Sequence, residues 1–232
     1  MTTFVLVHGA WGGAQTWRTV RPLLWAAGHE VFTPSLTGIG EREHLTSPQI
    51  SLSTHIDDVV GTVRFEGLDE VVLLGFSYGG MVITGALEHI GDRVRELVYL
   101  DAMVPANGQS AFDLIGPIAP TGPGADWAVD GISREFEDPA ESEFHVARRS
   151  RQPLRTFTEP VRLSTPLEEC PFGRTFVKAT GDPRREAHPD PFWEAADRYR
   201  DHPAWRYHES TSNHMIPQNR PAELAELLLA LA

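Results

Sequence analysis

A serine between two glycines is the residue of this chain best suited to nucleophilic chemistry. Ser77 lies in the pentapeptide GFSYG at 75–79, directly after the apolar run VVLL at 71–74 and before the apolar segment MVITGAL at 81–87. A sharp turn from a strand into a helix needs glycine two positions before and two positions after the serine, because the two backbones approach closely there. Such a turn presents the serine hydroxyl at the start of a helix, where it can attack a carbonyl carbon.

A serine hydroxyl is a poor nucleophile at neutral pH, so it needs a histidine base that a carboxylate orients. In a strand–turn–helix arrangement of this kind, the histidine follows both the serine and the acid along the chain. Only His214, in STSNHMIP at 210–217, lies in a loop just beyond the last expected strand. We therefore predict His214 as the base. Nine other histidines lie on earlier or less suitable segments: His8, His29, His44, His55, His89, His145, His188, His202 and His208.

Three aspartates are candidates for the carboxylate. Asp182 ends the expected strand in FVKATGD and is the first choice, because it would lie beside the histidine loop. Asp101 ends the preceding strand in LVYLDA and could reach the same imidazole. Asp190 is a third option. Each of them could instead cap a turn or a helix N-terminus.

A serine hydrolase also needs two hydrogen-bond donors for the oxyanion that forms during the reaction. We predict that one is the backbone N–H of Tyr78, after the nucleophile, and that the other is the N–H of Ala10 in the loop HGAWGG at 8–13. That loop could also suggest a dinucleotide site. Such a site would need an acidic residue at the end of the second strand, where Pro34 and Ser35 stand instead.

The elements that must position these residues alternate along the chain. Short β-branched runs and helix-like segments follow one another, which is typical of parallel strands joined by helical crossovers. We predict an α/β fold whose mostly parallel sheet of about six strands is covered by helices. The expected strands are 3–9, 29–34, 69–75, 95–102, 173–182 and 204–210, and the expected helices include 13–28, 53–65 and 222–232.

The alternation breaks in one place. About 65 residues separate the fourth expected strand from the fifth, far more than an ordinary connection, and residues 105–124 are crowded with Pro and Gly. We predict a core domain of residues 1–104 and 172–232 and a small helical cap inserted at 105–171. Its apolar side chains could form the roof of a pocket or only anchor the cap: Phe112, Leu114, Ile115, Trp127, Phe136 and Phe144. Trp11, beside the oxyanion loop, could line the same pocket.

Composition limits the partners and the compartment. The 232 residues carry a net charge of -12, and the 20 Lys and Arg form no basic stripe, which argues against a nucleic-acid partner. The single cysteine, Cys170, allows no disulfide within the chain. No apolar run approaches the ~18 residues of a membrane span. We expect a cytoplasmic protein without a membrane partner. Its oligomeric state is open, with a homodimer as one option.

The motifs together resemble the α/β-hydrolase superfamily. VLVHGAWGG, GFSYGGMVITG, LVYLDA and SNHMIP occur in that family's order and spacing, and the match covers nearly the whole chain. The compact length resembles the small plant methyl-esterase and hydroxynitrile-lyase branch. The run TGIGEREHLTSPQISLSTHIDDVV looks like bacterial pyrethroid-type carboxylesterases. The resemblance implies Ser77 as nucleophile, His214 as base and Asp182 as acid, with Ala10 and Tyr78 as oxyanion donors.

Departures from the family pattern narrow this interpretation. The lyase members carry a threonine and a lysine where this chain has Gly9 and Met215, so the chain resembles the esterases. Phe76 replaces the histidine that is usual before the serine, and we expect it to affect packing more than chemistry. A polar insert, PRREAHPDP, follows Asp182 and keeps Asp190 as an option.

The sequence thus predicts a serine hydrolase that cleaves a carboxylic ester of a small to medium, moderately hydrophobic molecule. It implies no cofactor and no metal, because REAHPDPFWE and EREH lack metal-ligand spacing. One alternative keeps the fold and the triad for a cyclase, C–C hydrolase or lyase reaction. The other alternative is a binding protein without turnover.

Overall fold

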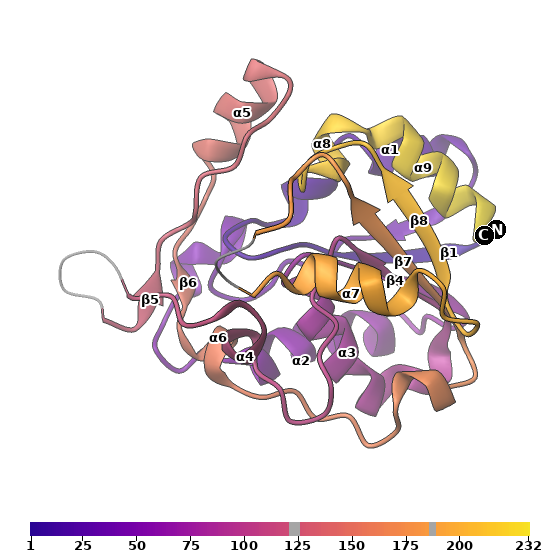
Figure 1. The fold of residues 1–232 in the computed structure, drawn as a ribbon, viewed down its shortest axis with the longest axis horizontal. Helices are drawn as coiled ribbons and strands as arrows, with labels where there is room; N and C mark the ends of the chain where they lie inside the picture. The colour runs from indigo at the N-terminus through magenta and orange to yellow at the C-terminus, as the bar shows by residue number, and fades with distance from the viewer. Residues whose placement is uncertain (121–125, 186–188) are drawn as a thin grey trace.

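A six-stranded parallel sheet forms the centre of the molecule (Figure 1). The computed structural model describes residues 1–120, 126–185 and 189–232. The strand order is β2-β1-β3-β4-β7-β8, and each neighbouring pair is parallel. The strands are β1 Thr3–Val7, β2 Glu30–Phe32, β3 Val71–Phe76, β4 Val94–Leu100, β7 Gly173–Ala179 and β8 Arg206–Ser210. The α/β fold and the number of strands predicted from the sequence are confirmed.

Helices cover both faces of the sheet, which is why the central strands are apolar on both sides. On one face lie α1 (Arg21–Ala26), α8 (Ile216–Asn219) and α9 (Pro221–Ala230), packed around a core that includes Trp17 and Leu228. On the other face lie α2 (Leu52–Phe65), α3 (Gly79–Ile90) and α7 (Pro191–Tyr199), with a larger core. Side chains of β3 alternate between the two cores, with Leu73 in the larger and Leu74 in the smaller.

The helix expected at 13–28 is two shorter pieces. A 3-10 helix spans Ala14–Trp17, and α1 begins only at Arg21. Pro22 lies at the first turn of α1. It is tolerated there because the N–H groups of a first helical turn have no partner within the helix, whereas it would break a helix interior. Helix α7 is an element that the sequence analysis did not predict.

Residues 105–171 contain more than short helices. Their elements are α4 (Ala111–Ile115), β5 (Ala128–Val129), α5 (Pro139–Val146), β6 (Gln152–Pro153) and α6 (Arg155–Thr158). β5 and β6 form a two-stranded antiparallel ribbon. Figure 1 shows α4 and α6 next to α2, whereas the ribbon and α5 project from the body of the molecule.

The strand order places the candidate residues at one end of the sheet. β1 lies between β2 and β3, so the chain leaves β1 toward one edge of the sheet and β3 toward the other. Ligands of such sheets bind at this switch point, beyond the carboxyl ends of the strands. The loop after β1 and the turn after β3, which carries Ser77, both lie there.

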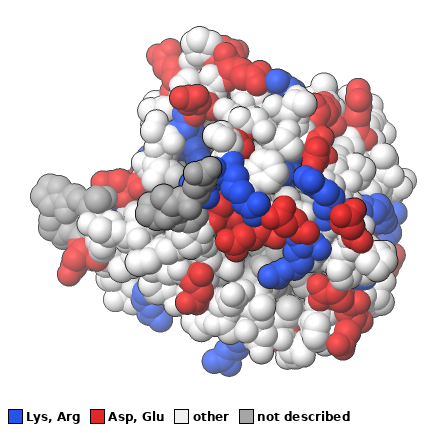
Figure 2. Space-filling view, viewed as in Figure 1, with Lys and Arg blue, Asp and Glu red and all other residues white. Residues whose placement is uncertain are grey.

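The surface mixes both signs of charge. On the face drawn in Figure 2, acidic and basic side chains are interspersed, and no continuous basic area is visible. No helix in the described ranges is long and apolar enough to cross a bilayer.

Candidate active site

The turn after β3 is a strained elbow that only glycines permit. Ser77 has a backbone φ of 56°, in the left-handed region that residues other than glycine rarely adopt. A Cβ atom on Gly75 would lie 2.6 Å from the carbonyl oxygen of Gly79, and one on Gly79 would lie 2.7 Å from that of Val7. Met103 stabilises the turn, because its N–H donates to the carbonyl of Ser77 at 3.1 Å. The serine side chain is thereby held at the start of α3.

The hydroxyl of Ser77 meets the imidazole of His214. Ser77 Oγ lies 3.0 Å from His214 Nε2, although 137 positions separate the two residues in the chain. His214 follows β8 in the loop that leads into α8, and only 4% of it is exposed. The structure therefore brings together the two residues that the sequence analysis selected as nucleophile and base.

Asp101, and not Asp182, contacts the imidazole. Asp101 Oδ2 lies 2.7 Å from His214 Nδ1. Asp101 directly follows β4, and a φ of 39° turns its side chain toward the histidine loop. Its other oxygen, Oδ1, accepts hydrogen bonds from Lys178 Nζ at 2.8 Å and from the N–H of Ala179 at 3.1 Å. Both carboxylate oxygens are thus held in place.

Asp182, the first choice from the sequence, serves the same loop in another way. Its Oδ2 accepts a hydrogen bond from the backbone N–H of His214 at 2.8 Å. This geometry differs from the expected one because Asp182 lies beyond the end of β7, level with the histidine backbone, whereas Asp101 reaches the ring. Asp190 is farther away: it caps α7, where Oδ1 accepts from the N–H of Trp193 at 3.4 Å.

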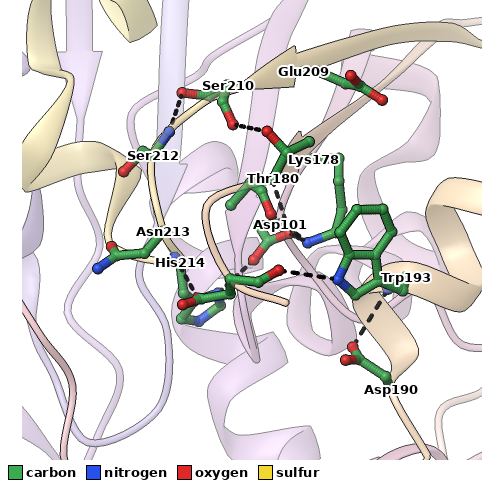
Figure 3. Close-up of polar contacts among 12 residues, drawn as sticks. Asp101, Lys178, Thr180, Asp190, Trp193, Glu209, Ser210, Ser212, Asn213 and His214 are labelled. Carbon is green, nitrogen blue, oxygen red and sulfur yellow. Dashed lines mark hydrogen bonds and ion pairs between the residues drawn. The ribbon is translucent and has the colours of Figure 1, made fainter. Parts of the chain in front are cut away.

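Lys178 is a functional candidate that the sequence analysis missed. It is 1% exposed, and its Nζ donates to Asp101 and, at 2.6 Å, to the carbonyl of Ala179. The ring of Trp193 covers it at 4.5 Å, and Trp193 Nε1 donates to the carbonyl of Asp182 at 3.3 Å (Figure 3). Lysine within the apolar strand FVKA was the available signal, since a buried lysine needs an anionic partner.

Burial favours the neutral form of the His214 imidazole. Burial lowers its pKa below 6.5, and the charge of Arg134 acts in the same direction against the opposing effect of Asp101. Burial alone would raise the pKa of Asp101, but the hydrogen bond from His214 and the charge of Lys178 hold it below its ordinary value. The pair therefore consists of a free imidazole base and an ionised carboxylate, which is the state that proton abstraction requires.

Two phenyl rings fix the plane of the imidazole. The ring centroids of Phe76 and Phe192 each lie 4.9 Å from that of His214. Phe76 comes from the elbow itself, and its replacement of histidine places an apolar ring beside the base. Phe192 comes from the first turn of α7. Both rings pack against the imidazole of His214.

Two backbone N–H groups beside the serine are available as donors. Within the described ranges, neither the N–H of Ala10 nor that of Tyr78 donates to a backbone carbonyl. The loop that carries Ala10 lies close to the nucleophile, because a Cβ atom on Gly9 would lie 3.0 Å from Ser77 Cβ. Ala10, Tyr78 and Ser77 line one cavity.

That cavity has a volume of about 200 Å³ and is mostly apolar. Trp11 is among the lining residues and is held in place by hydrogen bonds from its N–H to Gln152 and from its ring nitrogen to Val129, both 3.1 Å. Of the six apolar cap residues named from the sequence, only Ile115 lines it. The other lining residues outside the elbow and the β1 loop are Met103, Ile118, Ile132, Arg134, Phe157, Arg185 and Phe192.

Three of the cap aromatics pack against other residues of the cap. Phe112 stacks on Phe157 with ring centroids 5.7 Å apart. Phe136 stacks on His145 at 5.4 Å, and Phe144 lies under the guanidinium of Arg148 at 3.9 Å.

In the part of the chain that the structure describes, no group of three or more His, Cys, Asp or Glu could hold a metal. His188, one of the histidines set aside as base, lies outside the described residues.

A model of the alpha/beta hydrolase family matches residues 4–227. The chain belongs to this family. This alpha/beta hydrolase is 38% identical to a carbendazim hydrolyzing esterase from a Nocardioides species, over 100% of both chains. It is 34% identical to a pyrethroid hydrolase from Sphingobium wenxiniae, over 52% of this chain and 42% of that protein.

A solved methylesterase from Arabidopsis has the same fold, with a TM-score of 0.80 and 21% identity over 100% of this chain and 98% of that one. The likeness of this alpha/beta hydrolase to plant methylesterases and to bacterial pyrethroid-type esterases, which its motifs indicated, is therefore confirmed.

Proposed function

We propose that the protein is a carboxylesterase that works through an acyl-enzyme on Ser77. The observation that carries the proposal is the chain of short contacts from Ser77 Oγ to His214 Nε2 and from His214 Nδ1 to Asp101 Oδ2, at 3.0 and 2.7 Å. The full-length relative is named as an esterase, which supports the same reaction class.

In the proposed reaction, His214 takes the proton of Ser77 as the serine oxygen attacks the ester carbonyl carbon. Asp101 stabilises the imidazolium and keeps Nε2 directed at the serine. The oxyanion accepts hydrogen bonds from the N–H groups of Ala10 and Tyr78. His214 then gives the proton to the departing alcohol. In the second half, His214 takes a proton from water, the hydroxide attacks the acyl carbonyl carbon, and His214 returns the proton to Ser77 Oγ as the acid leaves.

Asp101 replaces Asp182 as our proposed acid. An orienting carboxylate must contact the ring nitrogen that faces away from the serine, and Asp101 does so. For Asp182 we propose a supporting role, because its carboxylate accepts from the backbone N–H of His214 and so fixes the loop.

The cavity suggests the kind of ester. Its volume of about 200 Å³ and its apolar lining fit a small to medium, moderately hydrophobic molecule. Residues 105–171 would act as a cap, since Ile115, Ile118 and Phe157 from that segment line the cavity together with Ser77. A cytoplasmic location and a homodimer remain predictions; the first rests on the lone Cys170.

Turnover of simple esters tests the proposal. Wild type and Ser77→Ala would be compared on p-nitrophenyl esters from acetate to octanoate. We expect Ser77-dependent hydrolysis with an optimum at a short or medium acyl chain. Hydrolysis that persists in Ser77→Ala would contradict the proposal, as would a wild type that hydrolyses none of the series.

A further inference from the structure

Arg134 faces the same cavity as the catalytic serine and is held there from both sides. It follows the β5 strand and lines the cavity with Ser77. On one side, Arg149 donates to the carbonyl of Ile132. On the other side, Asn213 in the histidine loop donates to the carbonyl of Glu135 at 3.1 Å. The backbone around Arg134 is therefore fixed both to the cap and to the loop that carries His214.

The guanidinium of Arg134 has no hydrogen-bonded or ion-paired partner in the described part of the chain, and Asp101, Asp182 and Asp190 act on its charge only through space. Its side chain makes no hydrogen bond or ion pair there, whereas each nearby carboxylate is already engaged. Asp101 binds Lys178 and His214. Asp182 accepts from the backbone of His214, at 2.8 Å.

The third nearby acid, Asp190, is engaged as well. Its Oδ2 lies 3.6 Å from Nε of Arg185, the other arginine that lines the cavity. Asp190 also accepts the backbone N–H of Arg185 at 3.1 Å. Of the two arginines at the cavity, Arg185 thus has a carboxylate of its own and Arg134 does not.

An unpaired guanidinium in this place is costly. Arg134 is half-buried among apolar residues, and burial lowers its pKa, although a guanidinium stays charged at any physiological pH. A charge that leaves water is tolerated when an opposite charge and hydrogen bonds replace the water. A carboxylate matches the fork of a guanidinium with two parallel hydrogen bonds. A ligand with an acidic group would supply both.

We propose that the preferred substrates are esters that carry a second, ionised acidic group, which Arg134 binds while Ser77 attacks the ester carbonyl. This inference rests on the proposed esterase function. The acidic group takes no part in bond making: water cleaves the ester to an acid and an alcohol, and the second carboxylate leaves unchanged. Arg134 is a specificity-determining residue in this account.

Matched pairs of substrates isolate the charge. In the first pair, the carboxylate para-acetoxybenzoate and the amide para-acetoxybenzamide differ in charge on the alcohol side of the ester. Monomethyl adipate and its half-amide, methyl adipamate, place it on the acyl side. Within each pair the shape is almost the same, so the ratio of the two kcat/KM values reports recognition of the charge. Effects common to both members cancel in the ratio.

We expect wild type to favour the carboxylate in at least one pair by about tenfold to a hundredfold, the range of a charge-assisted hydrogen bond. Arg134→Gln should bring that ratio to near one. Arg64→Gln, which removes an exposed arginine on α2 far from the cavity, should keep it. Salt should weaken the wild-type preference because it screens charge.

Two results would overturn the inference: equal rates for carboxylate and amide in both pairs with wild type, or a preference that Arg134→Gln retains. Neither would affect the proposed esterase function if wild type still hydrolyses the amide member and Ser77→Ala does not. Loss of all Ser77-dependent turnover would instead contradict the esterase proposal itself.

Discussion

Asp101 and Asp182 contact the same histidine through different atoms, and this difference separates their roles. Asp101 contacts the ring nitrogen Nδ1 at 2.7 Å, and Asp182 accepts the backbone N–H at 2.8 Å. Only a carboxylate that contacts Nδ1 can select the tautomer of His214. Asp182 holds the backbone of the loop, and its charge raises the pKa of His214 through space, without contact with the ring.

Paired substitutions test this division at the residue scale. Asp101→Asn should lower kcat by on the order of 10⁴, because an amide can favour the wrong tautomer of His214. Asp182→Asn should cost roughly tenfold or less, since the amide oxygen can still accept the backbone N–H. Steady-state kinetics on one activated ester would measure both. A larger loss in Asp182→Asn than in Asp101→Asn would reverse the assignment.

The sequence was sufficient to select Ser77 and His214, which the structure brings to 3.0 Å from each other, because each lies in a local pattern that few other residues share. It could not choose between Asp101 and Asp182. Both follow strands that are neighbours in the sheet, and the choice depends on a backbone φ of 39° at Asp101 and on side-chain direction. Arg134 left no local signal, since its segment has no regular pattern and its place depends on contacts with distant residues.

At the scale of elements, β7 supports the acid through Lys178. Lys178 lies next to the last residue of that strand, and its Nζ contacts Asp101 beneath the ring of Trp193 of α7. The strand is buried on both faces, so the lysine is hidden from water and Asp101 is its buried counter-charge. The pair joins β4 and β7 at the end of the sheet that carries the site.

Lys178→Met should lower the free energy of unfolding by about 3 kcal/mol or more, because it leaves the carboxylate of Asp101 buried without its counter-charge. In an Asp101→Asn background the same substitution should cost clearly less, since the amide carries no charge. Urea unfolding of the four proteins measures the difference. An equal cost in both backgrounds would mean that Lys178 contributes packing and no charge to this pair.

The strands were easier to predict than the connections. Runs such as VVLL and LVYL indicate buried strands, and the parallel order follows from the alternation with helices. The insertion 105–171 was recognised by its length, but its ribbon was not predicted. Each ribbon strand has only two residues, too few for a periodic pattern, and they pair across more than 20 positions.

At the scale of the whole molecule, buried histidines link stability to pH. Burial lowers the pKa of His8, His55 and His214 below 6.5, and that of His55 to about 3. Below pH 6.5 these histidines bind protons in the unfolded chain but stay unprotonated in the folded chain. The stabilisation is therefore complete above that pH and is lost as the pH falls toward the folded pKa values, by about 1.4 kcal/mol per pH unit for each such histidine.

The dependence of unfolding on pH can be assigned to one residue. Between pH 6.5 and 5.5, the free energy of unfolding should fall less steeply with pH in His55→Gln than in wild type. The two slopes should differ by at most about 1.4 kcal/mol per pH unit, the effect of one bound proton. His208→Gln, which removes an exposed histidine, should keep the wild-type slope. Urea unfolding at a series of pH values gives the slopes. Identical slopes for wild type and His55→Gln would show that His55 titrates alike in both states.

Covalent labelling tests whether Ser77 is an activated nucleophile. A fluorophosphonate reacts with an activated serine oxygen and releases fluoride, so intact mass and peptide mapping report both the number of adducts and the residue that carries them. The account predicts one adduct on wild type, located on Ser77, and none on Ser77→Ala. An unlabelled wild type, or an adduct on another residue, would contradict it.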